Sequence, residues 1–156
     1  MAEPGASGRE KPVAIVITGP TATGKTALSI GVAERLDGEI ISMDSRQVYR
    51  GMDIGTAKAT RAQRARVPHH GLDLVDPDQR YSAGHFSRDA RRWIEEIRRR
   101  GRTPILVGGT GFFLRALTHP LFREPEIPEH SREALKRWLA RQPDAKLRRW
   151  LADLDP

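Results

Sequence analysis

A glycine-rich segment that ends in a lysine and a hydroxyl carries the strongest chemical signal in this sequence. The segment GPTATGKT, residues 19–26, matches the P-loop pattern without a mismatch. Its glycines let the backbone curl so that successive N–H groups point at an anion, and Lys25 can reach phosphate oxygens. The Thr26 hydroxyl is placed to bind Mg²⁺. We therefore predict a phosphate site formed by Gly19, Pro20, Thr21, Ala22, Thr23, Gly24, Lys25 and Thr26.

A carboxylate, Asp44, ends the apolar run that follows the P-loop segment. Ligands of parallel sheets bind at the carboxyl ends of the strands, and Asp44 lies at such an end. From its position it can cap a turn, or bind a metal indirectly as acidic residues do in P-loop enzymes. The P-loop pattern leaves a second question open. The phosphate can belong to a nucleoside triphosphate or to a diphosphate leaving group, because a motif does not fix function.

The elements that must position these residues alternate between strands and helices. Short β-branched apolar runs predict strands buried on both faces, and apolar residues at helical spacing predict helices. The alternation predicts an α/β fold, P-loop NTPase-like, with three layers and a parallel sheet. Strands are expected at 13–18, 39–44 and 103–109, and helices at 26–36, 82–100, 110–117, 131–141 and 145–154, with a helical turn near 60–65 in the long loop 50–79.

Two of these helices show which face should be buried. The helix that follows the P-loop has apolar residues at helical spacing, and the helix that Ser82 can cap has a longer apolar stripe. The expected buried residues are Leu28, Val32, Ala33 and Leu36 in the first helix, and Phe86, Ala90, Trp93, Ile94 and Ile97 in the second.

Composition limits the possible environments and partners of the chain. It has 156 residues, a formal net charge of +7 and no cysteine, so disulfides and thiolate metal sites are excluded. The excess of basic residues favours a polyanionic partner such as nucleic acid. The alternative is that a GC-rich genome encodes ordinary surface charge as arginine. No apolar run is long enough to cross a bilayer, and residues 1–12 lack the apolar core of a signal peptide. We expect a disordered leader over 1–12, one domain over 13–156, no membrane, a cytoplasmic location and, by default, a monomer.

Several longer segments occur in order along the chain, with short gaps between them. They are DSRQVYRGMDIGTAK after the second predicted strand, followed by VPHHGLDLVDP, YSAGHF and PILVGGTGFFL. Together with GPTATGKT they resemble the tRNA dimethylallyltransferases, also called tRNA isopentenyltransferases. The resemblance runs from about residue 13 to the end of the chain, and DSRQVYRGMDIGTAK is much more specific than the P-loop alone.

The resemblance implies both a reaction and a set of site residues. The P-loop would hold the diphosphate of dimethylallyl diphosphate with Mg²⁺, and the prenyl group would pass to N6 of the adenosine 3′-adjacent to the tRNA anticodon. Asp44 would act as the general base, which suits a carboxylate held close to an extruded base, and Thr110 matches a position near that base. Gln47 could contact the adenine, since an amide donates and accepts hydrogen bonds. The residues expected to contact the tRNA anticodon stem-loop are Asp44, Ser45, Arg46, Gln47, Thr110 and Arg132.

The sequence also departs from the family pattern. Ala59 stands where proline is common, and Phe113 stands where tyrosine is common, which removes a hydroxyl near the expected prenyl path. Family members continue well past residue 156, with further strands and with helices that hold the anticodon stem-loop. We therefore expect the fold to be incomplete at the C-terminus. Residues 1–156 alone should fold poorly and have negligible catalytic activity, because sheet partners are missing.

Other functions remain open at this point. A P-loop kinase of nucleosides or small metabolites would use ATP at the same loop, with Asp44 as its acid and 61–66 as a lid. A basic RNA-binding fragment would bind stem-loops with a steep salt dependence. An isopentenyltransferase that acts on free adenine nucleotides is a near relative of the first hypothesis. The adjacent His69 and His70 are poorly placed to share a metal ion, so we expect them to lie in a loop.

Overall fold

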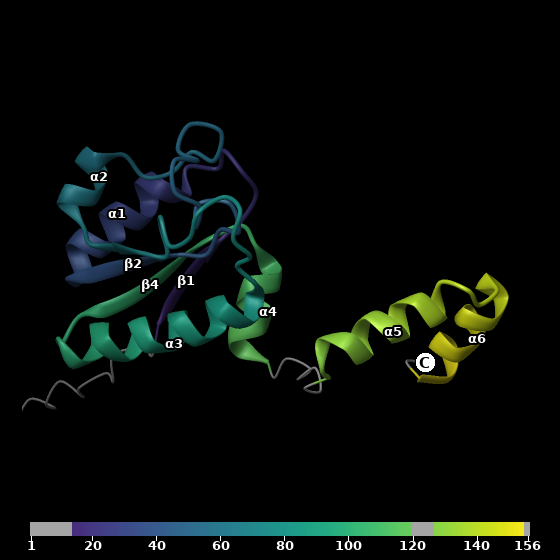
Figure 1. Ribbon diagram of the computed structural model, residues 1–156. Helices are drawn as coiled ribbons and strands as arrows, with labels where there is room; N and C mark the ends of the chain where they lie inside the picture. Colours follow the sequence, from purple (N-terminus) through teal and green to yellow (C-terminus); the bar gives the residue numbers. More distant parts are fainter. Residues whose placement is uncertain (1–13, 120–126, 155–156) are drawn as a thin grey trace, which may run out of the picture. The chain divides into compact units, whose positions relative to one another are not determined.

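The structure, a computed structural model, describes residues 14–119 and 127–154. The predicted leader over 1–12 lies outside these residues. They fall into two compact units, one within Met1–Leu121 and the other within Phe122–Pro156 (Figure 1). The first unit contains β1 (Ile15–Thr18), α1 (Lys25–Leu36), β2 (Gly38–Ser42), α2 (Arg61–Arg66), β3 (His69–His70), α3 (Ala83–Arg99), β4 (Thr103–Gly108) and α4 (Gly111–Thr118). The second unit contains α5 (Glu129–Leu139) and α6 (Asp144–Leu154).

The sheet of the first unit has four parallel strands in the order β1-β4-β2-β3. Because neighbouring residues of a strand point to opposite faces, Ile40 packs on the α1 side and Ile41 on the α3 side. Helices α1 and α2 lie on one side of the sheet, and α3 and α4 on the other (Figure 1). The predicted α/β fold with three layers and a parallel sheet is therefore confirmed.

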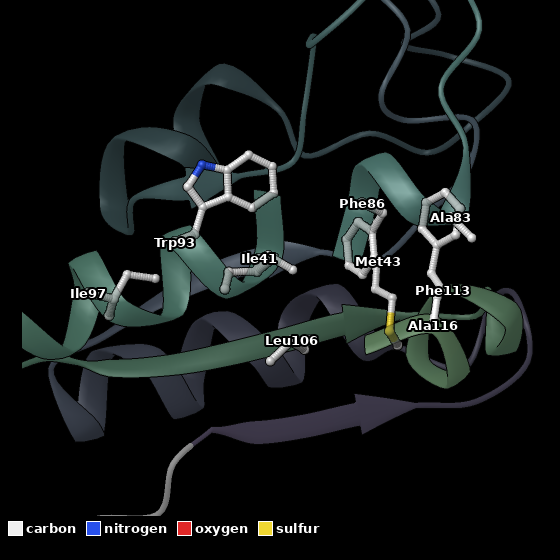
Figure 2. Packing of buried hydrophobic residues seen from close by; sticks show 10 residues of the cluster. Ile41, Met43, Ala83, Phe86, Trp93, Ile97, Leu106, Phe113 and Ala116 are labelled. Atoms are coloured by element: carbon white, nitrogen blue, oxygen red, sulfur yellow. The ribbon is translucent and has the colours of Figure 1, made fainter. Parts of the chain in front are cut away.

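The larger apolar cluster lies between the sheet and α3 (Figure 2). Ser82 begins α3 with a capping box, in which its hydroxyl accepts from the N–H of His85 and the His85 ring accepts from the N–H of Ser82. The predicted stripe of this helix is confirmed, with Ile94 partly buried and the other four residues buried. Phe113 stacks on Phe86 at 4.6 Å between ring centroids. The ring at the position where tyrosine is common therefore belongs to the core.

Two predictions about buried faces are wrong. Strand β1 is not buried on both faces, because it lies at an edge of the described sheet and Val16 is 43% exposed. The α1 prediction is wrong in part, because Leu28 and Leu36 are 58% and 45% exposed and Ile30, which was not predicted, is buried against β2 and β4. The predicted Ala33 is buried in the same cluster, and Val32 is partly buried there. Apolar residues lie on more than one face of this helix. Spacing alone therefore could not identify the face that meets the sheet.

The two histidines do not lie in a loop, as the sequence suggested, but form the short strand β3. His69 pairs with Ile40 and His70 with Ile41, in parallel register at the edge of the sheet. A strand of two residues is too short to show a periodicity, so no sequence pattern predicted it. On the opposite face from His69, His70 Nε2 lies 2.7 Å from the buried carboxylate of Glu39.

The second unit is a pair of helices whose bounds lie within two residues of those predicted. Trp138 of α5 stacks on Trp150 of α6, with ring centroids 5.5 Å apart and ring planes inclined by 10°. Lys146 Nζ lies 4.7 Å from the centroid of the Trp150 ring, within cation–π range. Across the whole described part of the chain, no helix combines the length and the apolar composition that spanning a membrane requires.

Glu39 should link the stability of the first unit to pH. Burial raises the pKa of this carboxyl, but hydrogen bonds from Arg100, His70 and Arg102 outweigh burial and hold the pKa below its usual value. A carboxyl with a lowered pKa stabilises the fold above its unfolded pKa of about 4.5, and this contribution is lost as pH falls through the folded pKa. We expect Glu39→Gln to lower the free energy of unfolding by roughly 1–3 kcal/mol at pH 7, and by less in acid.

Urea unfolding of the full-length gene product, followed by circular dichroism at several pH values, measures this difference. The matched control is Glu95→Gln, because Glu95 pairs with Arg99 on the exposed face of α3. That substitution should change the free energy of unfolding by less than about 0.5 kcal/mol. A Glu39→Gln deficit that stays constant between neutral and acidic pH would contradict the assignment.

Candidate functional site

A cavity of about 220 Å³ lies among the P-loop, the carboxyl ends of β2 and β4, and the loop that follows β2. Parallel strands place their carboxyl ends at one edge of the sheet, which explains why segments distant in sequence meet here. Predicted and unpredicted residues share this cavity. It is lined by 21–26 of the P-loop, by Ser42, Asp44 and Gln47, by Thr56, Ala57 and Ala59, by His69 and Leu72, and by Gly108 and Gly109 at the end of β4.

The P-loop has the backbone geometry of an anion-binding turn. Ala22 and Gly24 both have left-handed backbone angles, with φ of 64° and 80°, and α1 begins directly after Gly24. The N–H groups of a first helical turn have no partner within the helix, and the helix end carries partial positive charge. Thr23 Oγ1 donates to the carbonyl of Pro20 at 2.9 Å, and the Lys25 ammonium donates to the same carbonyl. Of the residues predicted to bind phosphate, 21–26 line the cavity, whereas Gly19 and Pro20 are not among its lining residues.

Asp44 lies two residues after β2 and organises the turn that follows it. Its Oδ1 accepts hydrogen bonds from the N–H groups of Arg46 at 2.8 Å and Gln47 at 3.3 Å. The turn-capping role that the sequence left open is therefore present. Oδ2 takes part in no hydrogen bond with the described residues. One oxygen can hold the turn while the other accepts a proton, so the capping role does not exclude a chemical one.

The ends of β2 and β4 are held together by close backbone contacts. The Met43 N–H donates to the Val107 carbonyl at 2.7 Å, and the Ser45 N–H donates to Thr110 Oγ1 at 3.2 Å. A Cβ on Gly108 would lie 2.0 Å from the Met43 carbonyl oxygen, so only glycine permits this approach. Thr110, which sequence reasoning placed near the reacting base, is thus bonded to the residue that follows Asp44.

The other residues predicted to bind tRNA lie in different environments. The amide of Gln47 is engaged within the protein, because Nε2 donates to the Thr56 carbonyl at 2.9 Å and Oε1 accepts from Ser42 Oγ at 2.8 Å. Ser45 and Arg46 are exposed beside the cavity residue Asp44. Arg132 lies in α5 of the second unit. Their contacts with tRNA stay predictions.

His69 is a cavity residue that sequence reasoning missed. Its Nδ1 lies 2.7 Å from the Val67 carbonyl, which can only accept, so Nδ1 carries the proton and Nε2 is an acceptor in the neutral ring. Burial lowers the pKa of His69 below its usual value, and the charge of Arg64 acts in the same direction. The ring is thus neutral at neutral pH. Ser42 is a second missed residue, and there a signal existed, because a serine directly follows the two apolar isoleucines of the strand, at its carboxyl end.

Comparison with known proteins identifies the family. A family model described as IPP transferase matches residues 47–156, and one described as Isopentenyl transferase matches residues 12–73. The chain belongs to the IPP transferase family. The tRNA dimethylallyltransferase of Stenotrophomonas maltophilia is 52% identical to this chain over 146 residues, 94% of the chain and 46% of that relative. The enzyme of the same name from Thermotoga petrophila is 48% identical over 141 residues, 90% of the chain and 46% of the relative.

Solved structures agree with this assignment. The chain resembles the tRNA delta(2)-isopentenylpyrophosphate transferase of Staphylococcus epidermidis with a TM-score of 0.68 and 45% identity, over 92% of this chain and 47% of that one. It resembles a eukaryotic dimethylallyltransferase acting on tRNA with a TM-score of 0.76 and 34% identity, over 89% and 35%. The P-loop NTPase-like fold is confirmed. The chain spans about half the length of the curated relatives it matches.

Gly108→Ala should disrupt the junction on which the cavity depends. The new Cβ would overlap the Met43 carbonyl oxygen, and a backbone atom cannot move aside without breaking the β2–β4 pairing. We expect a loss of about 4 kcal/mol or more in the free energy of unfolding, measured by urea unfolding. The control is Gly31→Ala in α1, where a Cβ meets nothing within 4 Å, and it should be neutral or stabilising by up to about 1 kcal/mol. Equal effects of the two substitutions would contradict the steric account.

Proposed function

We propose that the protein represented by this chain transfers the dimethylallyl group of dimethylallyl diphosphate to N6 of the adenosine 3′-adjacent to the anticodon in tRNA, releasing diphosphate. One observation carries the proposal: a P-loop and the carboxylate of Asp44 line one cavity, in a chain of the IPP transferase family. A diphosphate leaving group needs a ring of donors, and an amine nucleophile needs a proton acceptor. The names of the relatives support both the group transferred and the tRNA acceptor.

The P-loop supplies the leaving-group side of this reaction. Its backbone N–H groups and the start of α1 hold the diphosphate, and the Lys25 ammonium exchanges the Pro20 carbonyl for a phosphate oxygen. As the allylic C–O bond breaks, its electron pair leaves with the diphosphate. The growing negative charge is stabilised by Lys25 and by amides that are already in place, so little reorganisation is needed.

Asp44 supplies the acceptor side. The N6 amine of adenine is a poor nucleophile, so its position and the removal of its proton both matter. The new N–C bond forms between N6 and the allylic carbon while the N6 proton passes to the Asp44 carboxylate. Oδ2 is the oxygen suited to take it, since Oδ1 caps the turn of Arg46 and Gln47. Thr110 Oγ1 accepts from the Ser45 N–H and keeps its own hydrogen to donate near the base.

The oxygen atoms around the cavity suit Mg²⁺. Thr26 and Asp44 both line it, and Mg²⁺ is commonly held by one or two protein oxygens together with substrate phosphates. Within the described residues, no group of three or more His, Cys, Asp or Glu side chains could hold a metal by itself. Thr26 would hold the ion, which supplies positive charge against the diphosphate when it is bound.

The tRNA side of the proposal rests on charge and on the exposed residues beside Asp44. The net charge of +7 favours a polyanion, and Ser45 and Arg46 are exposed next to the cavity. Gln47 would contact the flipped adenine through the second lone pair of Oε1, which leaves its bonds to Ser42 and to the 56–57 backbone in place. Arg132 of α5 would contact the anticodon stem-loop. A protein that modifies tRNA in this way is expected to act in the cytoplasm.

Asp44→Asn and Lys25→Met should impair the two sides of the reaction differently. The assay uses the full-length gene product, labelled dimethylallyl diphosphate and an anticodon stem-loop. In Asp44→Asn the amide oxygen can still cap the turn, but the side chain cannot take a proton. We therefore expect kcat to fall by about a hundredfold or more with little change in dimethylallyl diphosphate affinity. Lys25→Met should raise the Kd for dimethylallyl diphosphate by about tenfold or more.

Arg99→Gln, on the exposed face of α3, is the control and should retain full activity. Transfer at the unsubstituted rate by Asp44→Asn would remove Asp44 from the role of proton acceptor. Unchanged dimethylallyl diphosphate affinity in Lys25→Met would remove the P-loop from the role of diphosphate site.

A further inference from the structure

Lys58 is a lysine whose side chain is completely buried beside the cavity wall. Its Nζ donates to the Tyr49 carbonyl at 2.7 Å and pairs with the carboxylates of Asp73 at 2.7 Å and Asp53 at 2.8 Å. An ammonium has three N–H donors, so all of them are used. A buried charge is costly unless it is paired, and here the partners come from two stretches of chain, the loop of Tyr49 and Asp53 after β2 and the segment of Asp73 after β3. Lys58 therefore ties these stretches to one point.

The stretches that Lys58 joins have constrained backbones. Ala57, on the cavity wall, and Asp73 both have left-handed backbone angles, with φ of 50° and 55°. Such conformations persist where surrounding contacts fix them. Asp73 is fixed from both sides, because Lys58 takes Oδ1 and Arg64 takes Oδ2 at 2.7 Å. Arg64 also donates to the Ala59 carbonyl at 2.8 Å. The wall formed by Thr56, Ala57 and Ala59 is thus held by charge pairs behind it.

This wall is connected to Asp44 through one side chain. The carbonyls of Thr56 and Ala57 accept from Gln47 Nε2 at 2.9 and 3.4 Å, so the wall fixes the Gln47 side chain. The Gln47 N–H in turn donates to Asp44 Oδ1. On the other side, the Gln47 carbonyl accepts from the Asp73 N–H at 3.3 Å. Lys58 therefore supports two groups that contact Gln47, the 56–57 backbone and Asp73. Gln47 belongs to the turn that orients the Asp44 carboxylate.

The diphosphate side of the cavity is independent of these contacts. Lys25 and Thr23 bond to the Pro20 carbonyl, and none of the described bonds of Lys58 reaches residues 19–26. We propose that Lys58 is a positioning residue, which sets the orientation of Asp44 toward the acceptor amine through the 53–57 loop and Gln47. This inference rests on the proposed function and deepens it, because it assigns the acceptor side of the site a support separate from the P-loop.

Lys58→Met in the full-length protein tests the inference. It removes the charge and its three bonds and keeps the apolar stem. We expect kcat for prenyl transfer to fall by about tenfold or more, with KM for dimethylallyl diphosphate within about twofold. Lys58→Arg keeps the charge and should recover a substantial part of kcat. Hydrogen exchange gives a readout that needs no activity: the Arg46 and Gln47 amides should exchange faster, while the amides of α1 should not change.

The matched control is Arg50→Met. Arg50 pairs with Asp76 in the same region, but both side chains are about half exposed, so activity should stay within about twofold. Asp53→Asn is a milder variant, because Asp53 is 63% exposed and its loss leaves Lys58 paired with Asp73. It should lower kcat by about threefold at unchanged KM. If Lys58→Met does not fold, the kcat of Asp53→Asn tests the inference in its place.

The outcomes separate this inference from the proposed function. No transfer by the unsubstituted full-length protein would contradict the proposed function and this inference with it. Transfer by that protein, with an unaltered kcat in a folded Lys58→Met variant, would contradict this inference alone. A rise in KM for dimethylallyl diphosphate that matches the fall in kcat would also overturn it, because Lys58 would then support the whole fold. If Lys58→Met does not fold, an unaltered kcat in Asp53→Asn overturns the inference.

Discussion

The backbone contact between the carboxyl ends of β2 and β4 is the constraint on which the rest of the site depends. Met43 donates to Val107, and the absence of a side chain on Gly108 lets the two strand ends approach. This approach sets the starting point of the turn that Asp44 caps and joins that turn to Thr110. Because β1 pairs with the other edge of β4, the same contact fixes where the P-loop lies relative to Asp44. The positions of both halves of the cavity, the P-loop and the turn of Asp44, thus depend on β4.

The two sides of the site differ in their electrostatic character. On the P-loop side, amides, a helix start and Lys25 make a region that favours negative charge. On the β2 side, the Asp44 carboxylate is held by backbone N–H groups, and behind its turn lies the ion pair of the buried Lys58 with the partly exposed Asp73. A reaction that releases an anion and a proton at the same time suits such a division, since each product charge has its own acceptor. The neutral ring of His69 adds an acceptor without adding a charge.

Much of the fold could be predicted from the sequence, because the relevant signals are local. The helix-capping residue Ser82 and the apolar stripe behind it predicted α3, and short apolar runs rich in β-branched residues predicted β2 and β4. The errors have a common cause: the edge position of β1, the buried face of α1 and the two-residue strand β3 depend on which elements pack together. Among site residues, the P-loop and Asp44 were predictable from motif and strand-end position. Lys58 was not, because its partners Asp53 and Asp73 meet only in the folded loop.

The proposed reaction requires that the P-loop binds an allylic diphosphate rather than a nucleoside triphosphate. Titration calorimetry of the full-length protein with dimethylallyl diphosphate, inorganic diphosphate and ATP, each with Mg²⁺, tests it most directly. The account predicts that dimethylallyl diphosphate binds most tightly, that inorganic diphosphate competes with it, and that ATP binds weakly. Tighter binding of ATP, followed by transfer of its terminal phosphoryl group to an acceptor, would contradict the account.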